Sequence, residues 1–134
     1  MRESIQVRLI LVRHAHSEPG QPDELRPLSA RGRKQARELG GRLAPMAPEL
    51  VLASPLLRAR ETAAAIAKAT GAELRVDERL APGASADDVL AALEGSSGTV
   101  VTVGHQPDCS EIAAALGAGE HDFPTAGQLA IRLP

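Results

Sequence analysis

Short apolar runs alternate with amphipathic helical segments along this chain, and this alternation restricts the fold more than any other feature. Residues 7–12, 49–53 and 99–103 are rich in Val, Leu and Ile, as is typical of strands buried on both faces of a sheet. Between them, apolar residues recur at the spacing of a helix. Strands that alternate with helices predict an α/β protein whose sheet is mostly parallel.

Two weaker strand patterns and the chain length complete the expected architecture. Residues 74–76 predict a further short strand, and the alternation over residues 128–133 is typical of an edge strand, which we expect to be antiparallel. We therefore expect a three-layer α/β/α sandwich, in a single domain over residues 1–134. The irregular segment 19–27 follows the first strand directly, where loops often carry function.

Each predicted helix begins at a polar residue that can cap it. These N-caps are Ser29, Ser54 (with Pro55 as the first helical residue), Ser85 (with Asp88 completing a capping box) and Asp108 with Glu111, whose helix runs to Leu116. Gly71 is a good helix stop. In the helix after Ser85, we expect Val89, Leu90 and Leu93 to face inward.

The composition excludes several classes of function. One Phe and no Trp or Tyr leave no aromatic platform for single-stranded nucleic acid. A net charge of -2 lacks the basic excess of a duplex-binding surface, so we expect no nucleic-acid partner. The basic residues after Ser29 are predicted to form a solvated helix face; they are Arg31, Arg33, Lys34, Arg37 and Arg42. Cys109 is the only cysteine, which excludes an internal disulfide and a Cys-based zinc site and favours a small packing residue.

The sequence also bears on localisation. No apolar run approaches the roughly 20 residues of a membrane span. Residues 1–6 are polar and lack the apolar core of a signal peptide. These observations predict a cytoplasmic protein without a membrane partner, which we expect to be a monomer or a weak oligomer.

Polar residues of catalytic type follow three of the predicted strands. The first strand ends in Arg13-His14, the second ends in Ser54-Pro55 before the helix that carries Arg58, and the strand at 99–103 is followed by His105. In a parallel sheet the carboxyl ends of the strands lie at one edge, where ligands bind. The sequence therefore predicts that two histidines and two arginines converge there from distant parts of the chain.

These residue types suit a phosphoryl group. Arginine side chains bind phosphate oxygens in a bidentate manner, and Arg58 is predicted in a first helical turn, where the backbone also favours an anion. The imidazole of His14 is a competent nucleophile towards phosphorus if one ring nitrogen is free and the other is held. Arginines stabilise the charge on the oxygens during transfer. The residues thus favour a phosphatase that needs neither metal nor cofactor.

The motifs resemble those of the histidine phosphatase (phosphoglycerate mutase-like) superfamily. Residues 11–14 (LVRH) resemble its Arg-His signature, residues 54–63 (SPLLRARETA) its second motif, and residues 103–107 (VGHQP) its third. Residues 26–32 (RPLSARG) and 123–127 (FPTAG) are similar to segments of its short, SixA-type phosphohistidine phosphatases. The three motifs span most of the chain in the family's order.

The resemblance implies a role for each site residue. His14 is phosphorylated, and the phosphoryl group is bound by Arg13, Arg26, Arg58 and His105, of which His105 also counts as catalytic. A carboxylic acid protonates the leaving group, and water then hydrolyses the phosphohistidine. Asp23, three residues before Arg26, is the favoured acid, with Glu24 and Glu78 as alternatives. His16 is expected at the pocket rim and His121 in solvent.

The SixA-type resemblance favours phosphohistidine in a protein as the substrate, with a histidine phosphotransfer domain as one candidate partner. The few residues between Gly71 and Thr99 leave no room for a covering insertion, which also favours an open pocket. The first alternative is a small phosphoester of a sugar, nucleotide or cofactor pathway. Two others are a metal hydrolase, prompted by His14-Ala15-His16, and a phosphate-binding module without catalysis.

Overall fold

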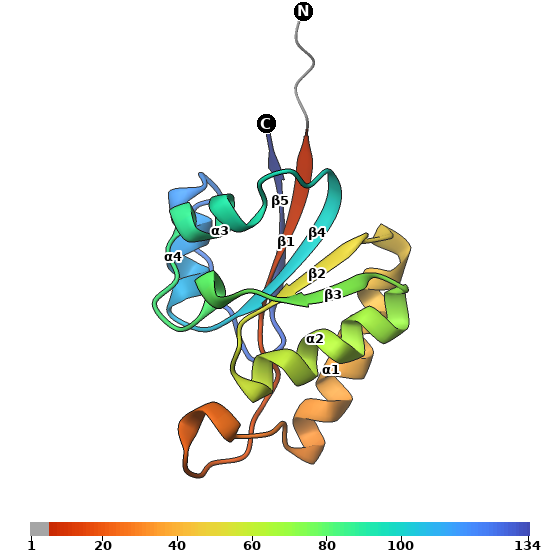
Figure 1. Ribbon diagram of the computed structural model, residues 1–134, viewed down its shortest axis with the longest axis vertical. Coiled ribbons are helices and arrows are strands. Elements are labelled where there is room, and N and C mark those ends of the chain that lie inside the picture. The colour runs from red at the N-terminus through yellow and green to blue at the C-terminus, as the bar shows by residue number, and fades with distance from the viewer. Residues whose placement is uncertain (1–5) are drawn as a thin grey trace, which may run out of the picture.

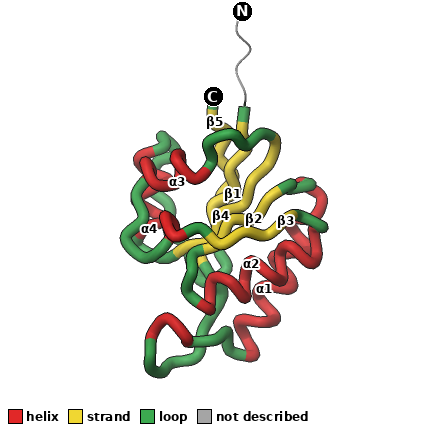
Figure 2. Tube along the Cα trace, viewed as in Figure 1, coloured by secondary structure: helices red, strands yellow, loops and turns green. Residues whose placement is uncertain are grey.

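Residues 6–134 of this protein are described by a computed structural model, in which one five-stranded sheet separates two layers of helices (Figures 1 and 2). The strands follow the order β3-β2-β4-β1-β5 across the sheet. Their bounds are Val7–Arg13 for β1, Leu50–Ala53 for β2, Glu73–Val76 for β3, Gly98–Gly104 for β4 and Gln128–Leu133 for β5. The chain is therefore the predicted α/β/α sandwich.

The pairing of the strands agrees with the prediction. β1, β2, β3 and β4 are parallel, whereas β5 pairs with β1 in the antiparallel direction at the edge of the sheet. In this register Arg13 lies opposite Gly104, and Ala53 lies opposite Val103. The carboxyl ends of β1, β2 and β4 are thus aligned at one edge of the sheet, directly before the residues of the predicted site.

Helices cover both faces of the sheet. α1 (Ala30–Leu43) and α2 (Leu57–Thr70) lie side by side on one face, and α3 (Ala86–Ala92) and α4 (Asp108–Ala115) on the other (Figure 1). Three short 3-10 turns occupy Asp23–Leu25, Ala44–Met46 and Glu78–Leu80. The first of them gives the segment 19–27, expected to be irregular, one turn of its own.

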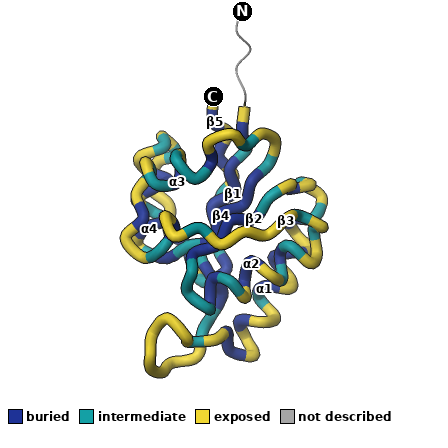
Figure 3. The backbone as a smooth tube through the Cα atoms, in the orientation of Figure 1, coloured by how far each residue is buried: buried dark blue, intermediate teal, exposed yellow. Residues whose placement is uncertain are grey.

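The two cores are built from alternate residues of the same central strands. Ile10, Val12 and Val101 pack with α1 and α2, whereas Leu9 and Val100 pack with α3 and α4. Burial is deep along β1 and β4, while β3 is exposed along its whole length (Figure 3). Aliphatic side chains fill both cores, and the single Phe123 packs into the second.

Several predicted helix ends are confirmed. Ser29 caps α1 by accepting a hydrogen bond from the N–H of Gly32, at 3.0 Å. Ser85 and Asp88 form a complete capping box at the start of α3. Gly71 ends α2 in the left-handed region with φ 78°, a conformation in which glycine has no steric penalty.

Three local predictions are wrong. Ser54 does not cap α2, because the helix begins at Leu57 after an extended Leu56, and the Ser54 hydroxyl bonds to a histidine instead. Asp108 does not cap α4; its carboxylate accepts a hydrogen bond from the N–H of Gly83, at 2.8 Å, and α4 has no side-chain cap. Leu90 is 41% exposed. α3 is only about two helical turns long, and its buried side is formed by Val89 and not by Leu90.

Two expectations concern the amino terminus and membranes. The polar segment 1–6 falls almost entirely outside the described residues, which begin at Gln6. Among residues 6–134, no helix has the length and apolar character that crossing a membrane requires.

We expect Gly32→Ala to destabilise the fold, because the first turn of α1 packs against the backbone of His16. A Cβ at Gly32 would lie 1.8 Å from the His16 carbonyl oxygen, which forces backbone to move. We expect a loss of about 1–3 kcal/mol in the free energy of unfolding, as for other overpacked sites. Gly41→Ala is the matched control: its Cβ meets nothing within 4 Å, so it should stabilise α1 by about 1 kcal/mol. Urea unfolding measures both, and equal effects would contradict the packing argument.

Candidate active site

His14 follows β1 and is fixed by its backbone at the carboxyl edge of the sheet. Its N–H donates to the Gly104 carbonyl at 3.0 Å, and its carbonyl accepts from the N–H of Ala126 at 3.1 Å. Nδ1 of the ring lies 2.7 Å from the carbonyl oxygen of Ala15. Because a carbonyl can only accept, Nδ1 carries the proton and Nε2 keeps its lone pair. The ring therefore has one nitrogen held and the other free for attack.

The ring of His14 is kept neutral by its surroundings. Its pKa is lowered from 6.5 to about 4, chiefly because burial penalises the charged form. The hydrogen bond to Ala15 opposes this effect, while the positive charges of Arg58, Arg13 and Arg26 add to it. At pH 7 the ring is thus unprotonated, which is the form that a nucleophile requires.

His105 lies beside His14, directly after β4. The two ring centroids are 5.4 Å apart. Nε2 of His105 lies 2.7 Å from Oγ of Ser54, and the pKa of His105 is lowered to about 4 by burial, then by His14 and Arg58. The N–H of Leu56 donates to Ser54 Oγ at 3.3 Å, and the hydroxyl proton of Ser54 remains available to Nε2. When this hydroxyl donates to Nε2, the ring proton of His105 is on Nδ1, the tautomer that offers Nδ1–H to a ligand.

Sequence reasoning placed Ser54 at this edge of the sheet but missed its role in the site. The sequence identified it as a helix cap, but it is fully buried and holds the ring of His105 in place. A signal was available: Ser54 follows a strand that is predicted to lie at the same sheet edge as the strand before His105. Its hydroxyl positions His105.

Three arginines surround the histidines. Arg58, only 7% exposed in the first turn of α2, donates from Nη1 to the backbone carbonyl of Asp23 at 2.9 Å. Arg13 donates from Nη1 to the Phe123 carbonyl at 2.9 Å. Arg26 is held by the segment that carries it, through the Glu18 carbonyl at 2.7 Å and the Ser17 hydroxyl at 2.9 Å.

The carboxylate of Asp23 bridges two of these arginines. Oδ1 accepts from Arg26 Nη1 at 2.9 Å, and Oδ2 accepts from Arg58 Nη2 at 3.2 Å. The hydrogen bonds from Arg26 and then from Arg58 hold the pKa of Asp23 below its usual range, although its side chain is 54% exposed. In the free protein Asp23 is therefore ionised near neutral pH. Glu24 and Glu78, the other candidate acids, are both exposed.

Two nitrogen atoms of the site are buried without a hydrogen-bond partner. Within residues 6–134, buried side-chain nitrogen or oxygen atoms that lack a partner are limited to Arg13 Nε and His105 Nδ1. A buried unpaired donor costs free energy, so such atoms point to a ligand that completes them. Both belong to the residues around His14, and a tetrahedral oxyanion offers acceptors to both.

Side chains outside the predicted set support the site. Thr62 Oγ1 accepts from the N–H of Ala15 at 3.0 Å and donates to the Arg58 carbonyl at 2.8 Å, which ties the turn after β1 to α2. Gln35 accepts from the N–H of His16 at 2.9 Å and donates to the Thr125 hydroxyl at 3.2 Å. Sequence reasoning missed Thr62 and Gln35, because their partners Ala15, His16 and Thr125 lie 19 to 90 residues away along the chain.

The remaining candidates have other surroundings. His16 is half-buried, with Nδ1 2.7 Å from Ser29 Oγ, while His121 is exposed and bonds to the Ala118 carbonyl. Cys109 is buried beneath the site, and burial raises the pKa of its thiol to about 12. In the described part of the chain no three His, Cys, Asp or Glu side chains are grouped closely enough to hold a metal ion.

Comparison with known proteins agrees with this geometry. The family model of the histidine phosphatase superfamily (branch 1) matches residues 9–82, which is more than half of the chain. An uncharacterized protein of Picosynechococcus sp. is 39% identical over 102 residues. The match covers 71% of this chain and 62% of that protein, so the chain spans less than two thirds of this relative's length.

Solved structures share the fold over almost the whole chain. The SixA protein of Nakamurella multipartitia has a TM-score of 0.79 and is 26% identical, with 96% of this chain and 86% of that chain covered. A protein histidine phosphatase SixA complexed with tungstate has a TM-score of 0.82 and 25% identity, with coverages of 92% and 86%. A mycobacterial glucosyl-3-phosphoglycerate phosphatase complexed with VO3 has a TM-score of 0.73 and 24% identity, with coverages of 92% and 90%; this likeness shows the fold alone.

Both site histidines should titrate far below the usual range. We expect the Cε1–H resonances of His14 and His105 to shift with midpoints near pH 4. An unfolded histidine binds its proton near pH 6.5, so stability should fall as the pH decreases from about 6.5 to 4, by on the order of 3 kcal/mol per histidine. NMR titration and urea unfolding at each pH measure these quantities.

The variant His14→Asn provides the control for this titration. It should remove one resonance and raise the pKa of His105, since His14 is one cause of its depression. Midpoints near pH 6.5 for both rings would contradict the burial argument.

Proposed function

This chain belongs to the histidine phosphatase superfamily, and we propose that it is a phosphatase that works through a phosphohistidine formed on His14. The observation that carries the proposal is the environment of that ring. Nε2 of His14 is free, and the buried donors Arg13 Nε and His105 Nδ1 beside it have no partner. A phosphoryl group at this position would satisfy both donors. The similar SixA that was solved in complex with tungstate, an oxyanion, supports the proposal that this fold binds a phosphoryl group.

The first step transfers the phosphoryl group to the enzyme. The lone pair of His14 Nε2 forms a bond to phosphorus, and the bond from phosphorus to the leaving group breaks with its electron pair. The leaving group takes a proton from Asp23. Arg13, Arg58 and Arg26 stabilise the negative charge on the three phosphoryl oxygens, which is the main demand of phosphoryl transfer.

The second step returns the enzyme to its starting form. Water attacks phosphorus and the bond to Nε2 breaks, so His14 recovers its lone pair and phosphate leaves. The proton lost by the attacking water goes to the Asp23 carboxylate, which balances the proton given in the first step. Throughout the cycle the Ala15 carbonyl holds Nδ1–H and keeps the ring oriented.

The role of Asp23 depends on the phosphoryl group itself. In the free protein Arg26 and Arg58 bind its carboxylate and lower its pKa, which disfavours a proton donor. Substrate oxygens need the same guanidinium groups, so binding displaces the carboxylate from them. Once it has lost its two cations, the pKa of Asp23 rises and the group can hold the proton that the leaving group takes.

The proposed substrate is phosphohistidine in a protein. The two SixA structures support it by likeness, as proteins named for phosphohistidine or protein histidine phosphatase activity. The chain between α2 and β4 supports it too, because it contains only β3, one 3-10 turn and the short α3. Without a long insertion there, a protein surface can approach the site. A small phosphoester remains the alternative, supported by the fold of the mycobacterial phosphatase.

One assay tests the nucleophile and the substrate class. Wild-type protein, His14→Ala and His121→Ala are incubated with a phosphohistidine peptide and a panel of sugar and nucleotide phosphates. We expect the wild type to prefer the peptide and His14→Ala to lose about 10³-fold or more of kcat, as when other nucleophiles are removed. A rapid quench should trap an acid-labile, alkali-stable phosphate on wild type and on His121→Ala, but not on His14→Ala. His121, exposed and outside the site, is the matched control.

Two results would overturn these assignments. Equal turnover by wild type and His14→Ala contradicts the mechanism. A strong preference for a small ester over the peptide contradicts the substrate choice but leaves the mechanism in place.

The variant Asp23→Asn tests the proton donor. We expect kcat on an alkyl phosphate to fall by about 10²–10⁴-fold, since alkoxide leaving groups need the proton, with little change on an aryl phosphate. Inorganic phosphate should inhibit Asp23→Asn more strongly than wild type, because no carboxylate competes for Arg58. Glu24→Gln and Glu78→Gln are the controls. If one of these controls loses kcat on the alkyl phosphate only, and Asp23→Asn does not, the acid is the glutamate changed in that control.

A further inference from the structure

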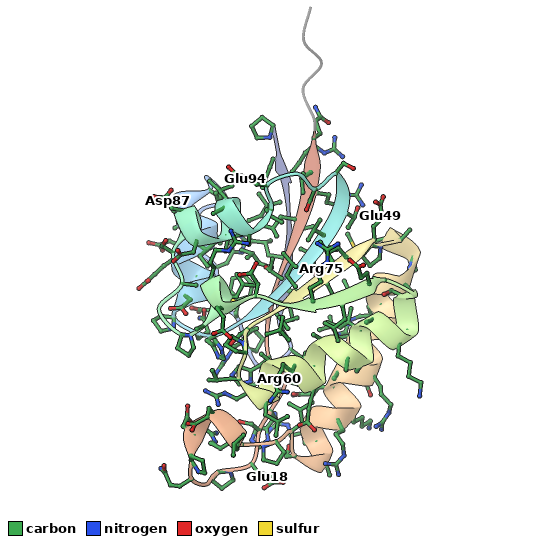
Figure 4. All side chains as sticks on the ribbon, viewed as in Figure 1. Glu18, Glu49, Arg60, Arg75, Asp87 and Glu94 are labelled. Atoms are coloured by element: carbon green, nitrogen blue, oxygen red, sulfur yellow. The ribbon has the colours of Figure 1, made fainter. Side chains whose placement is uncertain are left out.

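Charge is strongly divided between the two helical layers, although the whole chain has a net charge of only -2. α1 and α2 together carry eight Lys or Arg and two Glu. α3 and α4 carry four carboxylates and no basic residue. Asp87 and Glu94 mark the acidic side at α3, across the sheet from α1 and α2 (Figure 4). One face of this protein is therefore suited to an acidic partner.

A groove of about 640 Å³ runs along the basic face, between α1 and α2. Small apolar side chains line it, namely Ala36, Ala64, Ala65 and Ala69. Its rim carries three positive charges, on Arg33, Arg37 and Lys68. Small apolar residues allow the backbone of a docking helix to approach closely, while the basic rim selects an acidic one.

The basic rim is not neutralised by this chain. Within residues 6–134, no carboxylate lies within 4.0 Å of the charged groups of Arg33, Arg37 or Lys68. Glu61 is the one acidic residue of the lining, and its Oε1 accepts from the N–H of Leu28 at 2.7 Å. The groove thus presents uncompensated positive charge beside small apolar side chains.

The groove begins close to the active site. α2 carries Arg58 in its first turn and Glu61, Ala65 and Lys68 further along, so the groove extends about 15 Å from the phosphate-binding end of the helix. At its near end, Glu61 and Arg33 both bond to the backbone of Leu28, two residues after Arg26. A partner seated in the groove would therefore lie next to the segment that carries Arg26.

We infer that this groove is an exosite, which binds an acidic, amphipathic helix of the phosphorylated protein whose phosphoryl group enters the site at His14. The inference rests on the proposed function, since it assigns the docking surface for that substrate. The apolar stripe of the helix lies on the alanines, and its carboxylates pair with Arg37 and Lys68. None of the site residues lines the groove, so it serves recognition and does not assist the chemistry.

Charge-reversal variants test the exosite. Two probes carry phosphohistidine: a histidine phosphotransfer domain with an acidic surface helix, phosphorylated by phosphoramidate, and a nine-residue phosphohistidine peptide without a helix. For Arg37→Glu/Lys68→Glu we expect KM for the domain to rise about 10-fold with kcat unchanged, while both constants for the peptide stay at wild-type values. Wild-type KM for the domain should rise with salt. Arg42→Glu, the same change on another face of α1, is the matched control.

A charge swap makes the test reciprocal. In the swapped domain, lysines replace two glutamates on the acidic helix. Wild type should have a higher KM for the swapped domain than for the original one. Arg37→Glu/Lys68→Glu should have a lower KM for the swapped domain than for the original one. Equal changes of KM for the domain in Arg37→Glu/Lys68→Glu (the groove variant) and in Arg42→Glu would overturn the exosite. An unchanged KM for the domain in the groove variant would overturn it too. If wild type releases no phosphate from either probe, the proposed function fails instead.

Other occupants of the groove would appear as distinct results. Sedimentation velocity that shows a concentration-dependent dimer in wild type and a monomer in the groove variant would assign the groove to a second copy of this chain. Groove-dependent binding of a labelled RNA oligonucleotide, with KM for the domain unchanged, would assign it to nucleic acid. Either result overturns the assignment to a protein substrate.

Discussion

The parallel pairing of β1 with β4 is the constraint on which the candidate site depends. It holds Arg13 opposite Gly104, so the two histidines that follow these residues are neighbours. Both strands are buried on both faces, and a shift of one residue would exchange the side chains that face the two cores. The same packing that stabilises the sheet therefore also fixes the separation of His14 and His105. α2 then brings Arg58 to this edge, and the turn Asp23–Leu25 brings a carboxylate to Arg58.

Burial and positive charge explain both halves of the site's chemistry. Three arginines with a single bridging carboxylate leave an excess of positive charge, which favours an oxyanion. The same burial and the same arginines keep His14 unprotonated, so the ring retains the lone pair that attack requires. Asp23 stands in for an anion at Arg26 and Arg58 in the free protein. Affinity for phosphate and readiness of the nucleophile thus have one physical origin.

The sequence was reliable where a feature depends on neighbours along the chain. The strands, the edge strand at 128–133, the Ser29 cap and the Ser85–Asp88 capping box could all be predicted from local pattern. The predicted caps at Ser54 and Asp108 were wrong, because distant partners, His105 and Gly83, take their side chains. Thr62 and Gln35 were missed for the same reason. The site residues do meet at one edge, and their catalytic roles stay predictions.

Periodicity and motif order in the amino-acid chain were enough for the architecture, the family and the identity of His14 as the candidate nucleophile. Hydrophobic patterning dictates which faces are buried, and strand direction then dictates which strand ends meet. Only the tertiary structure determined the tautomer of His14 and the contact between Ser54 and His105. It also determined the pairing of Asp23 with two arginines and the division of charge between the helical layers. Each of these depends on distances between residues far apart in sequence, and hydrogen bonds and charges act over a few ångströms of space, whatever the separation along the chain.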